Sequence, residues 1–425
     1  MFRPMNLLCL SNGHGEDAIA LRILQALQQH PAHPQLAALP LVGEGHAYYK
    51  AGIPIVGPTQ SLPSGGFIYM DSRQTWRDLR GGLLQLTLAQ LQAIRAWTHT
   101  GGVVLAVGDI VPLLFAWWSG VPYAFVGTAK SEYYLRDEAG PHQRTSWFET
   151  METWAGSVYL PWERWLMGHR RCQAVFPRDS LTAETLKQWS LPVFDLGNPM
   201  MDGLGSTIAS SSIKTIIQAP ASENSLKIVL LPGSRVPEAY ANWQRIMQAV
   251  GGITRTLTDR RLLFLGAIAP GLDLHPLEQT LETQGWQASL PTAPANIFET
   301  HNASLILTQD SYADCLQQAD LAIAMAGTAT EQFVGLGKPA IIIPGGGPQF
   351  TFAFAEAQTR HLGPSITLVD QPEAVADAIQ ALLQAPDRLQ IISQNGRRRM
   401  GEPGAADRIA ACLMAQLAGN KSFHL

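Results

Sequence analysis

One pattern recurs along the chain: a short apolar run, a glycine-containing turn, and a segment with apolar residues at helical spacing, such as 17–29. Apolar runs predict strands in the first half at residues 6–10, 35–41, 103–107 and 122–126. These strands are apolar throughout and are separated by helices, which indicates a parallel sheet covered on both faces.

The same pattern restarts after a polar, serine-rich stretch at residues 203–224. Here the predicted strands are 227–231, 262–265, 304–307, 321–325 and 340–343. The sequence therefore predicts an α/β protein with two doubly wound, Rossmann-like domains that face a central cleft, where ligands bind at the carboxyl ends of the strands. The expected parts are an N-terminal domain, a linker, a C-terminal domain and a helical segment that packs back toward the first domain, at residues 1–202, 203–225, 226–395 and 396–425.

Composition narrows the class of protein. The chain has 425 residues, too many for one ordinary core, and its net charge of -4 argues against a nucleic-acid partner. The four cysteines are scattered without metal-binding spacing, which favours buried thiols in a reducing compartment. The most apolar stretch, 103–126, contains Asp109, Pro112, Gly120 and Pro122, so it predicts strand, helix and strand rather than a membrane span. With no signal peptide recognised at the start, we expect a cytoplasmic protein.

The first candidate ligand-binding turn follows strand 227–231 and contains Gly233, Ser234 and Arg235, with Glu238 shortly after. A glycine between strand and helix lets backbone amides approach a phosphate at the positive end of the helix dipole, and a guanidinium adds bidentate phosphate contacts. A tight turn capped by Ser234, with Pro237 in the first helical turn, explains the same residues without a ligand.

The second turn follows strand 321–325 and comprises Gly327, Thr328, Ala329, Thr330 and Glu331. The functional interpretation places a diphosphate on the amides after Gly327 and ribose hydroxyls on Glu331. The structural alternative is a capping box made by Thr328 and Glu331.

The third turn, 344–349, places three glycines and Gln349 after a buried strand. Glycines are costly to order, which favours a backbone that a ligand approaches closely, and Gln349 offers both a donor and an acceptor to a sugar hydroxyl. A merely flexible loop is the alternative.

Together these turns resemble the donor half of bacterial lipid-A-disaccharide synthases and of the wider GT-B group that uses UDP-N-acetylglucosamine-type donors. The motifs that carry the resemblance are LPGSR with its nearby glutamate, and GTAT-E followed by GKPAIIIP. Residues 197–202 resemble the hinge of that group, and 397–411 its closing helix. The resemblance implies a GT-B fold, a C-terminal donor domain, an N-terminal acceptor domain, and inverting transfer from a UDP-sugar without an essential metal or cofactor.

The loop between the first strand and helix holds Gly13, His14, Gly15, Glu16 and Asp17. Its glycines would let an acceptor approach, and the histidine or either acid can orient or deprotonate a hydroxyl. The loop resembles only in part the Gly-Glu-x-Ser-Gly-Asp of the synthases and the histidine-ending, glycine-rich loop of cell-wall N-acetylglucosaminyltransferases. A glycine turn whose acids favour the helix N-terminus is the alternative.

Asp109 follows strand 103–107 and, through the resemblance, matches an aspartate thought to act as the base in the synthases. The surrounding sequence differs from the family pattern. An N-cap for the helix near Pro112 explains it equally well, and one aspartate can do both.

Nine of the eleven tryptophans precede residue 200, and the segment 161–171 joins aromatic to basic residues. Trp162, Trp165 and Leu166 can share one helical face, as interfacial helices require. This pattern predicts a lipid-like acceptor reached at a membrane surface; the alternative is that the tryptophans are core residues.

We therefore expect a glycosyltransferase of glycolipid biosynthesis that moves a hexosamine-type sugar from a UDP-sugar to a lipid-like acceptor hydroxyl, peripheral on the inner face of a membrane. Two alternatives stay open: an enzyme like the UDP-N-acetylglucosamine 2-epimerases, and a non-catalytic relative that binds lipid or nucleotide. The sugar, the acceptor and the oligomeric state are not predicted.

Overall fold

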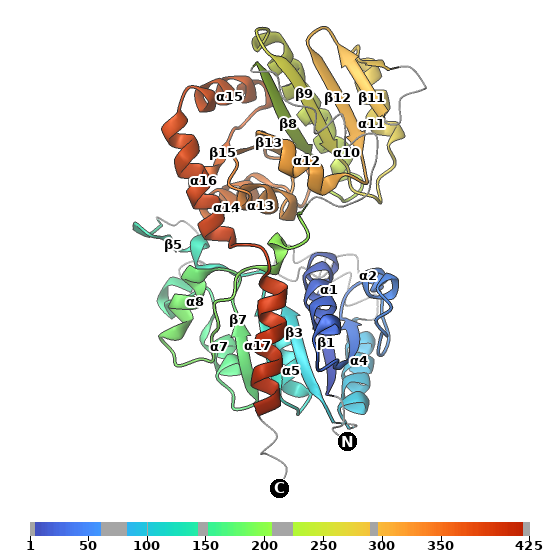
Figure 1. The fold of residues 1–425 in the computed structure, drawn as a ribbon, viewed down its shortest axis with the longest axis vertical. Helices are drawn as coiled ribbons and strands as arrows, with labels where there is room; N and C mark the ends of the chain where they lie inside the picture. The colour runs from blue at the N-terminus through green and yellow to red at the C-terminus, as the bar shows by residue number, and fades with distance from the viewer. Residues whose placement is uncertain are drawn as a thin grey trace. The chain divides into compact units, whose positions relative to one another are not determined.

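A computed structural model describes residues 5–60, 83–99, 101–142, 152–205, 224–289 and 296–419 (Figure 1). The chain divides into two compact units, one made by residues 1–202 and 402–425 and the other by 203–401. Most of the predicted linker, residues 206–223, lies outside the described part of the chain. Each unit contains its own, largely parallel sheet, so the predicted fold class of two doubly wound α/β units is confirmed.

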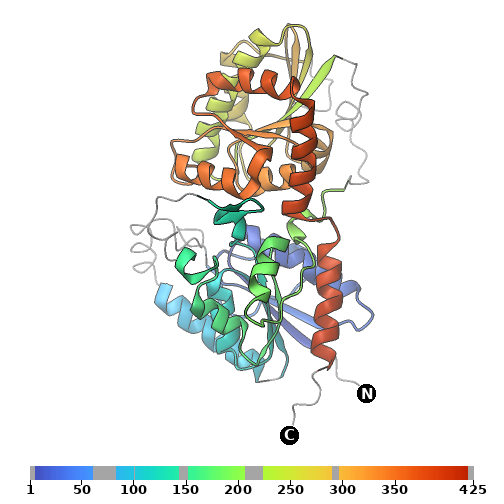
Figure 2. The ribbon, with the colours of Figure 1, turned by 90° about the vertical axis from the view of Figure 1, so that its left-hand side faces the viewer.

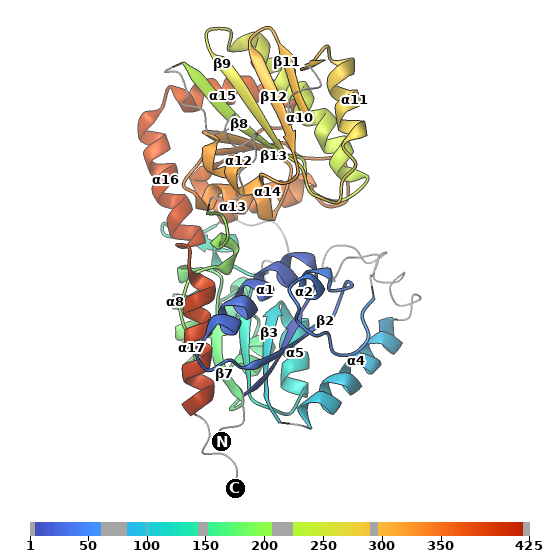
Figure 3. The same ribbon diagram turned by 45° about the vertical axis from the view of Figure 1, so that its right-hand side comes forward.

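The first unit contains these elements: β1 (Asn6–Ser11), α1 (His14–Gln29), β2 (Gln35–Pro40), α2 (His46–Lys50), α4 (Leu83–Thr98), β3 (Val103–Gly108), α5 (Ile110–Trp118), β4 (Tyr123–Gly127), η1 (Glu132–Tyr134), β5 (Arg136–Asp137), β6 (Gly140–Pro141), α7 (Pro161–Met167), β7 (Cys172–Phe176), α8 (Ser180–Lys187), η2 (Pro199–Met201) and α17 (Ala405–Gly419). Its five-stranded sheet has the order β2-β1-β3-β4-β7, with every pair parallel. Helices α1 and α17 pack against each other, as do α5 and α7, and Figure 3 shows α1 and α17 together on one side of the sheet.

Every residue of β3 is buried, as the continuous apolar pattern predicts for a central parallel strand. The chain leaves β1 toward β2 on one side and returns to β3 on the other. This reversal creates a switch point at the carboxyl ends of β1 and β3, the place where doubly wound sheets bind ligands.

The second unit contains these elements: β8 (Ser225–Leu231), α10 (Glu238–Thr256), β9 (Arg261–Ala267), α11 (His275–Thr283), β10 (Gln287–Ala288), β11 (Asn296–Thr300), β12 (Ala303–Thr308), α12 (Tyr312–Gln318), β13 (Leu321–Ala324), α13 (Thr328–Gly335), β14 (Ala340–Ile342), α14 (Phe352–Leu362), η3 (Gly363–Ser365), β15 (Ile366–Leu368), η4 (Pro372–Ala374), α15 (Val375–Leu383) and α16 (Pro386–Met400). Its sheet has the order β10-β11-β12-β9-β8-β13-β14-β15, and its switch point lies between β8 and β13. Helix α10 packs against α11 and α15, whereas α13 and α14 pack against α16.

The structure differs from the sequence expectation at one edge of the second unit's sheet and in the segment where the second unit ends and α17 of the first unit begins. Strands β10 and β11 pair antiparallel at one edge of the sheet, and neither was predicted. The segment 397–411 is not one helix, because α16 ends at Met400 and α17 begins at Ala405. Gly401 between them has a φ of 78°, and Pro403 follows, so the helix stops there.

Helix α17, the last helix of the chain in Figure 2, packs against α1 and β7 of the first unit, and its N-terminus is capped by a residue of that unit. The Asp202 carboxylate accepts from the backbone amides of Gly404, Ala405 and Ala406. Arg408 donates to the carbonyl of Leu196 at 2.9 Å. These contacts cap the helix and explain why residues distant in sequence form one unit.

Candidate functional site

The turn after β8 lies at the switch point of the second unit. Gly233 has a φ of 94°, Ser234 is exposed and Arg235 is half-buried. Helix α10 begins at Glu238 with Pro237 as its N-cap, and no side chain caps it, so the expected Ser234 cap is not formed. The buried Asn242 was not predicted; its amide donates to the carbonyls of Pro232 at 3.0 Å and Met325 at 3.4 Å, which ties the ends of β8 and β13 together.

In the turn after β13, Gly327 is the N-cap and α13 begins at the exposed Thr328. The helix has no side-chain cap, so the capping-box interpretation is wrong. Thr330 is fully buried and its hydroxyl donates to the carbonyl of Ala326 at 2.6 Å, which supports the turn from behind. The first amides of a helix have no partner within it, so those of Thr328 and Ala329 can bind an anion.

Glu331 lies one turn into α13 and is 9% exposed. Its Oε1 is 3.6 Å from Nδ1 of His361, a fully buried residue of α14. The partly open carboxylate is therefore held at the edge of the same turn that presents the helix amides.

Glu238 does not project from the donor turn; it supports the glycine-rich loop after β14. Its Oε1 accepts from the amides of Phe350 at 2.8 Å and Gln349 at 3.2 Å. A Cβ on Gly347 would lie 2.5 Å from the Glu238 carboxyl carbon, so a larger residue there would displace the carboxylate that holds the loop. The Gln349 side chain is half-exposed beside the loop that Glu238 holds.

In the first unit, the loop after β1 separates its polar residues into buried and accessible ones. Gly13 is the N-cap of α1 with a φ of 140°, whereas a Cβ on the exposed Gly15 would meet nothing within 4 Å. Asp17 is 2% exposed and accepts from the Ser11 hydroxyl at 2.5 Å; Tyr48 donates to the same hydroxyl at 2.7 Å. Burial raises the pKa of Asp17 from 3.8 to about 7.

Asp109 stands at the end of β3, beside this loop. Its Oδ1 accepts from the Val111 amide at 2.8 Å, which confirms the N-cap of α5. Gly108 brings the two loops together: it has a φ of 140°, and a Cβ there would lie 3.1 Å from Asn12 and 3.6 Å from the Glu16 side chain. Glu16 and Asp109 therefore share the switch point; the side chain of His14 lies outside the described residues.

A buried ion pair influences Asp109. Lys130, just after β4, donates to Glu163 at 2.7 Å and to the Val158 carbonyl at 3.0 Å. Burial raises the pKa of Asp109 above its ordinary value, the Val111 amide opposes that rise, Glu163 adds to it and the Lys130 ammonium lowers it. No sequence pattern pointed to Lys130 or Glu163, because 32 intervening residues separate them.

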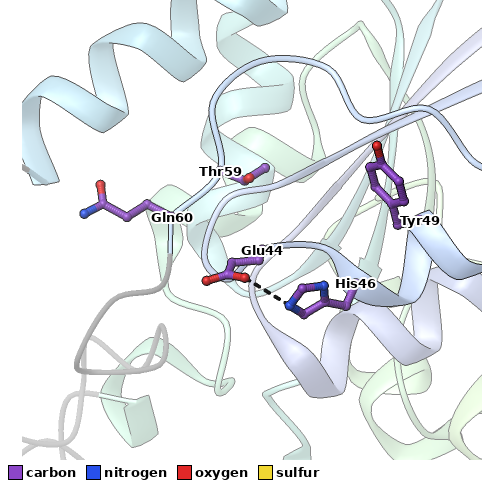
Figure 4. Close-up of a pocket in the computed structure, with 5 residues that line it drawn as sticks. All are labelled: Glu44, His46, Tyr49, Thr59 and Gln60. Atoms are coloured by element: carbon purple, nitrogen blue, oxygen red, sulfur yellow. Dashed lines mark ion pairs between the residues drawn. The ribbon is translucent and has the colours of Figure 1, made fainter.

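A pocket of about 680 Å³ lies beyond the carboxyl end of β2 and is lined by Glu44, His46, Tyr49, Thr59 and Gln60 (Figure 4). The Glu44 carboxylate pairs with His46 at 3.0 Å. The Gly43 amide donates to the Gln60 carbonyl at 3.0 Å. This hydrogen bond joins the two chain segments that line the pocket, the one around Glu44 and the one around Gln60. The adjoining Leu41 amide donates to the Ser11 carbonyl at 2.8 Å, so this wall continues into the loop after β1.

The aromatic surface of the first unit comprises four rings in contact, Trp117, Trp118, Trp165 and His169, together with Trp162, which lies one turn before Trp165 on α7. Trp118, Trp162 and Trp165 are 44%, 50% and 57% exposed, so these tryptophans are not core residues. The guanidinium of Arg95 lies 4.9 Å over the Trp118 ring. Leu166, expected on the same exposed face, is buried, because the seven-residue helix α7 turns it toward the core.

Within the described ranges, no group of three or more His, Cys, Asp or Glu side chains is placed to hold a metal ion. None of the helices in the part of the chain that the structure describes is both long and apolar enough to cross a membrane.

The two Rossmann-like units define the GT-B fold, the fold expected from the sequence, and comparisons with solved structures agree. The UDP-GlcNAc 2-epimerase from Neisseria meningitidis, bound to UDP-GlcNAc, is 14% identical with a TM-score of 0.54, over 98% of this chain and 100% of that chain. MurG from Acinetobacter baumannii is 14% identical with a TM-score of 0.56, over 97% and 100%. These likenesses show the fold.

Sequence comparison adds one curated relative. The chain is 27% identical over 240 residues to the lipid-A-disaccharide synthase of Syntrophus aciditrophicus (strain SB). The match covers 53% of this chain and 57% of that protein, a little over half of each. No family model matches the chain.

Proposed function

We propose that this protein is a glycosyltransferase that moves a hexosamine-type sugar from a UDP-sugar to the hydroxyl of a lipid-like acceptor. The observation that carries the proposal is the pair of loops at the β8–β13 switch point. There Arg235, the α13 amides and Glu331 follow the carboxyl ends of two neighbouring central strands. The likeness to a lipid-A-disaccharide synthase supports the transferase class, and the UDP-GlcNAc-bound epimerase of the same fold supports the donor class.

The donor site would hold each part of the nucleotide with a different group. Amides after Gly327 and the Arg235 guanidinium would bind the diphosphate, because a helix N-terminus and a bidentate cation both favour phosphate oxygens. Glu331 would accept from the ribose hydroxyls, and Gln349 from the glycine-rich loop would contact the sugar. As the bond to the anomeric carbon breaks, the same cation and amides would stabilise the negative charge that develops on the leaving UDP, without requiring a metal.

The base would come from the first unit, and Asp109 fits that role best. Its Oδ1 is engaged by the helix cap, and Oδ2 can take the proton of the attacking hydroxyl. Burial raises the pKa of Asp109, which makes its carboxylate a stronger base than an exposed aspartate. Glu16 stands beside it, whereas Asp17 is buried and orients Ser11. Attack on the anomeric carbon from the face opposite UDP would invert its configuration.

The acceptor would be held by polar and apolar surfaces of the first unit. Glu44, His46, Tyr49 and Gln60 offer hydrogen-bond donors and acceptors for a hydroxylated headgroup (Figure 4). The aromatic surface, with Arg95 beside Trp118, suits the interface of an anionic membrane from which a lipid can be taken. We therefore expect a peripheral membrane protein of glycolipid biosynthesis.

The test is release of UDP from UDP-N-acetylglucosamine, followed with and without an extracted lipid fraction. Transfer predicts release that depends on the lipid, and Asp109→Asn should lower the rate by about 10²–10⁴-fold, the usual contribution of a general base. The epimerase of the same fold keeps a second candidate open. Conversion of the sugar nucleotide into its 2-epimer without any lipid would establish that activity and overturn transfer.

A further inference from the structure

Three side chains of α14 face the turn between β13 and α13. They are Phe354, Gln358 and His361, at spacings of four and three residues, which places them on one face of the helix. The tip of the Phe354 ring lies 3.5 Å from the position that a Cβ on Gly327 would occupy. The donor turn is therefore backed by a single helix face.

Gln358 is the polar contact to the first part of this turn. It is 3% exposed, and its Nε2 lies 3.3 Å from the carbonyl of Ala326 and 3.2 Å from that of Gly327. In a trans peptide the carbonyl and the N–H of the next residue point in opposite directions, so holding these two carbonyls on the α14 side directs the amides of Gly327 and Thr328 to the opposite side. Gln358 thus fixes the orientation of the amides that would receive a diphosphate.

His361 is the polar contact to the second part. It is fully buried one turn further along α14, and its Nδ1 lies 3.6 Å from Oε1 of Glu331. That distance exceeds a hydrogen bond but lies within an ion-pair contact, so a small movement of the carboxylate closes it. Other charged groups near His361 are the adjacent Arg360 and the buried Arg399, which donates to the His361 carbonyl at 2.7 Å. Arg399 anchors the end of α14 and so the position of the imidazole.

We infer that α14 is the positioning helix of the donor site, with Gln358 setting the diphosphate-binding amides and His361 setting the Glu331 carboxylate for the ribose. The inference rests on the proposed UDP-sugar site. It divides nucleotide recognition between two buried residues that touch no ligand themselves. The two residues therefore affect different parts of the same nucleotide.

The experiment measures the affinity of the full chain for UDP and for 2′,3′-dideoxyuridine diphosphate by calorimetry. His361→Leu should weaken UDP binding about tenfold and leave the dideoxy nucleotide unchanged, because only UDP carries the hydroxyls for Glu331. Gln358→Leu should weaken both nucleotides by the same factor. His361→Asn, whose amide nitrogen can replace Nδ1, should restore most of the affinity for UDP.

A double-mutant cycle tests whether His361 acts through Glu331. Once Glu331→Gln is present, His361→Leu should cause no further loss of UDP affinity. Thr359→Val is the matched control on the same helix, since its hydroxyl donates to the Ala355 carbonyl within α14, and it should change the affinity for neither nucleotide. Melting temperatures without nucleotide verify that each variant is folded.

The outcomes separate the inference from the proposed function. A wild-type chain that binds neither nucleotide refutes the UDP-sugar site, and the inference falls with it. A wild-type chain that prefers UDP keeps the proposed site. The inference alone is then overturned if His361→Leu and His361→Asn weaken the binding of both nucleotides equally. Additive losses of affinity in the double-mutant cycle overturn it as well.

Discussion

The buried Asp17 makes the first unit less stable as pH rises. Its pKa is raised by burial from 3.8 to about 7, so the folded state binds a proton that the unfolded state releases. Stability from the neutral carboxyl is present below pH 3.8 and is lost as pH rises through about 7. Applied to these two values, linkage gives a loss of about 3 kcal/mol between pH 4.5 and 8.

Asp17→Asn removes this titration and keeps an oxygen for the Ser11 hydroxyl. Urea unfolding at pH 4.5 and 8 should show the variant gaining about 3 kcal/mol relative to wild type at the higher pH. Glu184→Gln, at an exposed position of α8, is the control and should show the same difference from wild type at both pH values. If the stability difference between Asp17→Asn and wild type were the same at both pH values, as expected for the control, the reasoning would be refuted.

Three further predictions concern the base, the helix cap and the membrane. Lys130→Met, combined with Glu163→Gln to avoid a buried unpaired charge, should move the acidic limb of the kcat/KM profile to lower pH, because Glu163 raises the pKa of Asp109 more than the Lys130 ammonium lowers it; a limb that stays in place or moves to higher pH would argue against Asp109 as the base. Asp202→Ala should lower the free energy of unfolding by about 1–2 kcal/mol through loss of the α17 cap, and Asp202→Asn by less; equal losses would contradict the capping role. Trp162→Ser with Trp165→Ser should reduce sedimentation with anionic vesicles at low salt, while Trp154→Ser, exposed outside the aromatic surface, should not; equal reductions would rule out a local docking surface.

The fold could be predicted because its central strands are apolar from end to end. Strands such as β3 and β8 are buried on both faces, and that burial is visible in the sequence. The edge strands β10 and β11 are short and largely exposed, so no apolar run marks them. Strand β7 is largely buried, but it is only five residues long, follows two arginines and contains Gln173, so its short apolar run was missed.

The positions of the candidate site were accessible to sequence reasoning, but the role of each side chain was not. Thr328 and Glu331 have capping-box spacing, yet the helix begins one residue too early for that box, with Gly327 and not Thr328 as its N-cap. Glu238 supports residues more than a hundred positions away, a contact that local patterns cannot reveal. A weak signal did exist for Asn242 and Gln358, since each is a polar residue on the buried side of an amphipathic helix.

The central claim is that the second unit binds a uridine nucleotide at the β8–β13 switch point. The most direct measurement is a thermal-shift panel of UDP, GDP and TDP with their sugars, on wild type and Arg235→Ala. The account predicts stabilisation by UDP and UDP-N-acetylglucosamine that is largely lost in Arg235→Ala. Stabilisation by GDP and not by UDP, or a UDP shift unchanged by the substitution, would contradict it.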